Sequence, residues 1–193
     1  KFIYELDVPV MVGGVAGYTQ AKHLMRTGAA GVLVGFGGGS AMTTRKGLGI
    51  SAPMATAIAD VAAARSDYLD ESGGRYVHVI ADGGLSRSGD LVKALALGAD
   101  AVMIGAPLAR ASEAPGQGWY WGNEAHSVDF PRGVRTPLGV VGTLEEVLYG
   151  PSHHVDGTRN IVGALKRAMA TCGYLDLKKF QKAEMTLVPE YRG

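Results

Sequence analysis

The chain has 193 residues, of which 47% are hydrophobic, and both values are typical of one soluble globular domain. Nineteen basic and 18 acidic residues leave a net charge of +1, so we expect no nucleic acid and no membrane as a partner. The single cysteine, Cys172, excludes an internal disulfide and fits a reducing cytoplasmic setting, and its place in a late helical segment predicts core packing.

Four strands separated by three helices are predicted in chain order. The apolar runs 8–14, 29–35, 76–81 and 101–105 predict strands, and segments 18–26, 53–69 and 88–97 carry apolar residues at helical spacing. Because the strand runs lack polar alternation, we expect a parallel sheet whose strands are buried on both faces. Gly28 and Gly98 stand where a left-handed helix stop is expected. The pattern predicts an α/β fold.

The segment 114–137 is rich in aromatic residues, Gly and Pro and has no clear period, which predicts a long functional loop. Its residues Trp119, Tyr120 and Trp121 fit either a plug at one end of the fold or a ligand contact. Helical patterns at 143–148, 160–171 and 175–182 follow. Periodicity fits both half of a barrel and an open doubly wound sheet, since functional loops follow the carboxyl ends of strands in both.

Three glycine-containing loops follow predicted strands and are candidate ligand contacts. Residues 35–40 hold four glycines in their first five positions, which lets the backbone approach a ligand, but the loop lacks the Lys-Ser/Thr ending of a P-loop. At Asp82-Gly83-Gly84, a carboxylate at a strand end can accept two hydrogen bonds from a ribose diol. Gly105 and Ala106 offer backbone N–H groups to a phosphate. Each loop alone also fits a simple tight turn.

These motifs carry a family resemblance. Residues 35–45, Gly-Phe-Gly-Gly-Gly-Ser-Ala-Met-Thr-Thr-Arg, resemble the catalytic loop of the IMP dehydrogenase and GMP reductase family. Residues 80–84 and 88–90 resemble its nucleotide-binding strand, and the likeness continues through 101–105 to 163–169. The resemblance implies that residues 1–193 are the C-terminal half of a (β/α)8 TIM barrel with strands five to eight, a flap-like loop at 114–137 and terminal helices at 143–182.

The resemblance also implies a site for a purine nucleoside monophosphate and a nicotinamide cofactor, NAD or NADP. The implied substrate-binding positions are Ser40, Asp82, Gly83, Gly84, Gly105, Ala106, Tyr120, Arg132 and Gly133. The implied cofactor-binding positions are Gly14, Gly35 and Gly37. Backbone carbonyls of Gly37, Gly39 and Met42 match a monovalent-cation (K+) site, and Thr44 matches a catalytic threonine. By the same likeness the protein would be a homo-oligomer, a tetramer.

The sequence departs from the family at the nucleophile. Family enzymes attack the purine with a cysteine thiolate, whereas Met42 carries a thioether with no proton to lose. Gly14, Ala106 and Arg132 stand where the family has asparagine, serine and Gln or Glu, and loop 114–137 is shorter than the dehydrogenase flap. Three readings stay open: oxidation of IMP to XMP with NAD and water, reduction of GMP to IMP with NADPH, or non-catalytic purine-nucleotide binding.

Overall fold

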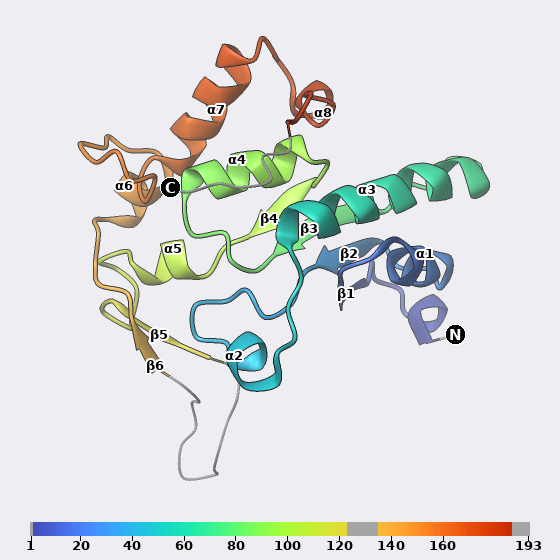
Figure 1. Cartoon of the computed structure of the whole chain (residues 1–193), viewed down its shortest axis with the longest axis horizontal. Helices are drawn as coiled ribbons and strands as arrows, with labels where there is room; N and C mark the ends of the chain where they lie inside the picture. The colour runs from blue at the N-terminus through green and yellow to red at the C-terminus, as the bar shows by residue number, and fades with distance from the viewer. Residues whose placement is uncertain (1, 123–134, 187–193) are drawn as a thin grey trace.

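A four-stranded parallel sheet forms the centre of the computed structural model, which describes residues 2–122 and 135–186 (Figure 1). The strands are β1 (Met11–Val15), β2 (Gly31–Val34), β3 (His78–Asp82) and β4 (Ala101–Met103), and they pair in that order. The main connecting helices are α1 (Tyr18–Arg26), α3 (Met54–Glu71) and α4 (Ser88–Ala96). The predicted α/β fold with a parallel sheet is therefore confirmed.

The remaining elements are short, apart from one helix near the end of the chain. They are η1 (Phe2–Glu5), α2 (Thr44–Leu48), α5 (Ala106–Ala109), β5 (Trp119–Trp121), β6 (Arg135–Pro137), α6 (Leu144–Leu148), α7 (Ile161–Thr171) and α8 (Leu177–Phe180). None of the helices in the described ranges is long and apolar enough to cross a membrane.

The face of the sheet that is covered by the helices forms one hydrophobic core with them. Val32 and Val34 of β2 and Val79 of β3 are fully buried there, beside Met25 of α1 and Ile58 of α3. Burying each such side chain stabilises the fold by about 1.5 to 3 kcal/mol. Helices α1 and α4 end before glycines in the left-handed region, with φ of 103° at position 28 and 109° at position 98, as the sequence predicted.

Three sequence expectations are wrong in detail. Strands β1 and β4 are not buried on both faces: Met11 is 56% exposed and Met103 48% exposed, because the sheet is open and has no neighbour beyond either strand within the described residues. Within the predicted loop 114–137, strands β5 and β6 pair antiparallel. Strands of only three residues are too short for hydrophobic periodicity to reveal. Cys172 is exposed rather than packed in the core.

A buried carboxylate ties the amino end of the sheet to α3 and α8. Asp100, just before β4, has an 8% exposed side chain, and five donors converge on it. They are Arg65, Tyr76, the Val79 backbone, Lys178 and Gln181. Burial alone would raise the pKa of Asp100, but these hydrogen bonds outweigh it and hold the pKa well below its usual range. The network fixes the frame from the end opposite the strands' carboxyl edge.

Candidate functional site

The end of β1 and the loops after β2 and β3 touch one another at the carboxyl edge of the sheet. A Cβ added to Gly38 would lie 2.9 Å from both the Gly83 carbonyl carbon and the Gly84 nitrogen, so only glycine permits this approach. Gly35 lies against the Asp82 carbonyl oxygen, and Gly14 lies against the Gly35 carbonyl oxygen. The loops that the sequence singled out are thus brought together by backbone packing.

A cavity of about 370 Å³, hereafter the first cavity, opens between these loops and the segment after β4. Its volume falls in the range of about 300 to 1,000 Å³ that small-molecule sites occupy. Its lining residues are Gly38, Gly39, Ser40, Asp82, Gly83, Gly84, Leu85, Ser86, Met103, Ile104, Gly105, Ala106 and Tyr120. Seven of the nine predicted substrate-binding residues belong to this wall. The other two, Arg132 and Gly133, lie outside the described residues.

Asp82 is the one carboxylate in the wall of the first cavity, as far as the described residues show. It ends β3 and is half-buried, and its side chain accepts no hydrogen bond from any residue in the described ranges. Burial raises the pKa of Asp82 because the charged form has lost part of its water without gaining a partner. Two neighbouring hydroxyls placed in the cavity would supply the missing donors, so the carboxylate could accept hydrogen bonds from a diol.

Tyr120 of β5 contributes to the wall of the first cavity. Tyr120 of β5 brings its hydroxyl oxygen to 2.5 Å from where a Cβ on Gly105 would stand, so glycine is required there as well. Next to it, the Arg135 guanidinium of β6 stacks over the Trp119 ring at 4.1 Å from the centroid. Figure 1 shows α2, α5 and the β5–β6 pair together on one side of the molecule. The aromatic segment thus supplies both a cavity wall and its support.

A second cavity of about 510 Å³ adjoins the first and shares Gly38, Gly39 and Ser40 with it. Met42 lines this second cavity, where its Cγ would lie 2.7 Å from a Cβ added to Gly39. Thr44, the first residue of α2, is half-buried and belongs to the wall of neither cavity. The implied nucleophile position therefore borders the neighbouring space rather than the one around Asp82.

The implied cofactor and cation positions lie around the same edge. Gly37 has φ +73° and packs against the Ile50 carbonyl and the backbone of Arg45, which anchors the start of α2 on the loop. The Gly39 carbonyl accepts the Met42 amide N–H at 3.1 Å, so one of the three implied cation ligands already has a donor. Within residues 2–122 and 135–186, no group of three or more His, Cys, Asp or Glu side chains could hold a metal.

Several residues that line the two cavities were not predicted from the sequence. Leu85, Ser86, Met103 and Ile104 border the first cavity, and Thr136 of β6 borders the second. The first four directly follow or precede the glycine motifs, so their neighbours could have indicated them. Thr136 lies far along the chain and reaches the site only because β5 and β6 pair. No local signal marks it.

Comparison with known proteins decides the family. The family model of the IMP dehydrogenase / GMP reductase domain matches residues 2–134, more than half of the chain. The chain belongs to this family. It is 58% identical to an uncharacterized oxidoreductase of Mycolicibacterium smegmatis over 96% of the chain and 50% of that relative. It is 33% identical to inosine-5'-monophosphate dehydrogenase of Aquifex aeolicus over 91% of the chain and 38% of that enzyme.

A solved structure also resembles this member of the IMP dehydrogenase / GMP reductase family. An IMP dehydrogenase/GMP reductase-like protein from Corynebacterium glutamicum matches with a TM-score of 0.85 and 58% identity, covering 95% of this chain and 48% of that one. The chain spans about half the length of the Mycolicibacterium and Corynebacterium proteins. The family resemblance predicted from residues 35–45 and 80–84 is confirmed.

Proposed function

We propose that this chain forms half of a purine-nucleotide oxidoreductase whose monophosphate substrate binds in the first cavity. The observation that carries the proposal is the meeting of Ser40, Asp82, Gly84 and Gly105 around about 370 Å³ of space. The formal reaction is oxidation of IMP to XMP with NAD and water, in guanine nucleotide metabolism. Family membership supports the reaction class, and the cavity supports the choice of residues.

Each residue has a distinct part in binding. The Asp82 carboxylate accepts hydrogen bonds from both ribose hydroxyls, which supply the donors that it lacks in the described structure. The backbone N–H groups of Gly83, Gly84 and Gly105 and the Ser40 hydroxyl border the same space and donate to phosphate oxygens. Tyr120, which lines the same cavity, supplies a further hydroxyl donor. Charged ligand oxygens make these hydrogen bonds stronger than neutral ones.

The sheet itself is proposed to be strands five to eight of a (β/α)8 barrel. Its face away from the helices carries apolar side chains: Met11, Leu33, Ile80 and Met103 stand at alternating positions along the four strands. Such a face needs a cover, and the rest of a barrel would provide one. The chain matches about half of the length of these relatives, which supports this assignment. The terminal helices then belong to the same catalytic domain.

Two alternatives rest on specific residues. Reduction of GMP to IMP with NADPH needs no activated water and so fits the short 114–137 segment better than the dehydrogenase reaction. A non-catalytic purine-nucleotide-binding role follows from Met42, since a thioether cannot form the neutral covalent adduct that a thiolate forms. Both alternatives retain the first cavity as the nucleotide site.

The nicotinamide dinucleotide would exchange a hydride with the purine, and by the family likeness its proposed contacts are Gly14, Gly35 and Gly37. Three backbone carbonyls, of Gly37, Gly39 and Met42, suit a monovalent cation such as K+ because hard oxygen donors are its usual ligands. The cation is part of the proposal, as are a cytoplasmic location and a tetramer. Light scattering on the full-length protein tests the last of these.

The deciding experiment is an NAD(P)H absorbance assay on the full-length protein with IMP and GMP, run in K+ and in Na+, beside calorimetry of nucleotide binding. NADH or NADPH formation with IMP supports the dehydrogenase, and NADPH consumption with GMP supports the reductase. Tight nucleotide binding with no turnover supports the non-catalytic reading. Absence of binding by either monophosphate contradicts the whole proposal.

A further inference from the structure

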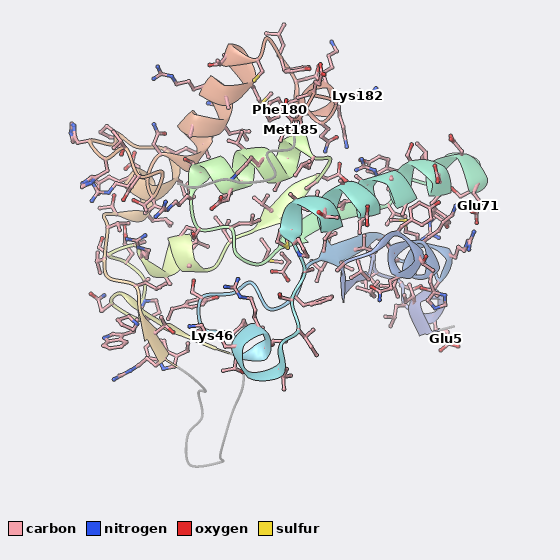
Figure 2. The ribbon with its side chains drawn as sticks, viewed as in Figure 1. Glu5, Lys46, Glu71, Phe180, Lys182 and Met185 are labelled. Carbon is pink, nitrogen blue, oxygen red and sulfur yellow. The ribbon has the colours of Figure 1, made fainter. Side chains whose placement is uncertain are left out.

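A third cavity, of about 540 Å³, lies between α3 and α4, which run side by side over the sheet (Figure 1). Most of its wall is apolar and includes Met54, Ile58, Leu85, Leu97 and Met185. Met185 reaches the cavity from the segment after α8, beside α4 (Figure 2). The volume falls in the range of about 300 to 1,000 Å³ that small-molecule sites occupy, and such sites are mostly apolar. Size and lining therefore fit a small organic ligand.

The charged side chains around the third cavity leave one carboxylate without a cation. The Asp60 carboxylate of α3 lines the cavity and makes no ion pair or hydrogen bond with any residue in the described ranges. On the facing helix, the Lys93 ammonium lies 3.3 Å from the Asp90 carboxylate and is therefore already paired. Lys93 is the one cation among the lining residues that the structure describes. The cavity thus combines an apolar wall with an excess of negative charge.

The third cavity and the first cavity have part of their walls in common. The loop 83–85 lines both, so a ligand between α3 and α4 would lie against the same loop that borders the first cavity. Met54 makes a second link, because its sulfur lies 2.5 Å from where a Cβ on Gly35 would stand. The same glycine packs on the Asp82 carbonyl oxygen. Occupancy of the third cavity should therefore change how tightly the first cavity binds its ligand.

We propose that the third cavity binds a small amphipathic cation, a molecule with an apolar ring body and a protonated amine. The body packs between the two helices, and the amine pairs with Asp60. An anionic ligand is disfavoured, because it would face Asp60 and Asp90 with only Lys93 to offset them. The site itself does not depend on the proposed function. Its effect on monophosphate binding does rest on the proposed function, through the shared loop 83–85.

The test measures binding of two probes with the same ring to the full-length protein by calorimetry: cationic tryptamine and anionic indole-3-acetate. We expect tryptamine to bind at least threefold more tightly, a modest factor because Asp60 is exposed and exposed ion pairs are weak. Asp60→Asn should remove this preference. The matched control is Asp70→Asn, another exposed aspartate of α3 that lies outside the cavity wall, and it should keep the preference.

A second pair of variants tests the apolar part of the cavity. Ala59→Leu puts a larger side chain into the space from an exposed position of α3, so it should weaken binding of tryptamine at least threefold without disturbing the core. Ala63→Leu, at an exposed position of the same helix outside the cavity wall, should leave binding unchanged.

The link between the cavities is tested by titrating IMP or GMP with and without saturating tryptamine. We expect at least twofold tighter monophosphate binding, because a ligand packed against loop 83–85 restrains it. By thermodynamic reciprocity the monophosphate should tighten tryptamine binding by the same factor. Unchanged affinities in both directions overturn the link.

Three results would overturn the site itself. They are absence of tryptamine binding by the wild type, a preference for tryptamine that survives Asp60→Asn, and tryptamine binding that appears only after deletion of residues 187–193, since the chain itself would then be the occupant. A wild type that binds tryptamine through Asp60 but binds neither monophosphate refutes the proposed function and leaves the third-cavity site standing.

Discussion

Replacing Asp100 by asparagine tests whether the amino-end network holds the sheet together. The substitution keeps the shape but puts an amide N–H₂ group where Oδ2 accepts from Arg65 Nη1 at 2.8 Å and from the Val79 amide at 2.9 Å. Breaking a buried ion pair costs about 3 to 5 kcal/mol. The Arg65 pair counts fully, since its side chains are 14% and 8% exposed, whereas Lys178 is 61% exposed and adds little. We therefore expect a loss of about 3 kcal/mol, the lower end of that range.

The assay is urea unfolding of the full-length protein, followed by circular dichroism. Asp90→Asn is the matched control, because Asp90 is 34% exposed and pairs only with Lys93, at 3.3 Å, in the described ranges. That exposed pair should contribute at most about 1 kcal/mol. If Asp100→Asn lowers the free energy of unfolding by no more than the control does, the network is not a structural anchor and the reasoning from burial fails.

Three further predictions concern the same network and the first cavity. Because the pKa of Asp100 is depressed in the folded protein, its contribution to stability is complete above the unfolded pKa of about 3.9 and is lost as the pH falls below that value. In acid titrations, the wild type should therefore lose stability more steeply than Asp100→Asn below about pH 4. Asp82→Ala should weaken IMP or GMP binding at least tenfold by calorimetry while leaving stability equal or higher, since its half-buried carboxylate has no partner in the described ranges; unchanged affinity removes Asp82 from the site. Gly38→Ala should weaken nucleotide binding by pushing the β2 and β3 loops apart, whereas Gly89→Ala, with open space around its Cβ, should not; equal effects would contradict the packing argument.

Hydrophobic periodicity located the helices and strands well because a buried parallel strand is a continuous apolar run. Helix α1 begins and ends where the sequence predicted, α3 is shifted by one residue at its start and two at its end, and α4 ends one residue early. What periodicity could not provide was the environment of each strand. Strands β1 and β4 have the same apolar character as β2 and β3, yet they are more exposed because they form the two edges of the described sheet.

The candidate site was predictable where it is built from backbone and poorly predictable where it is built from distant side chains. Glycine motifs mark loops that need close approach, and the contact between Gly38 and Gly83 is of that kind. Thr136 reaches the second cavity through a pairing of β5 with β6, which no local pattern encodes. The donors around Asp100 come from segments up to 81 residues away, so its importance was equally invisible along the chain.

Met42→Cys tests whether the chemistry lacks only its nucleophile. The introduced thiol would border the second cavity next to Gly39, two residues before α2 and close in sequence to Arg45 and Lys46, and nearby cations favour the thiolate. We expect absent or very slow turnover of IMP and GMP by the unmodified full-length protein, because losing several kcal/mol of barrier reduction at about 1.36 kcal/mol per tenfold costs many thousandfold in rate. The variant should recover activity in the NAD(P)H absorbance assay, with Met103→Cys, a methionine of the first cavity, as the control that should not. If the unmodified protein already turns over either nucleotide at about 1 per second, an ordinary enzyme rate, another group performs the attack and position 42 is not the missing element.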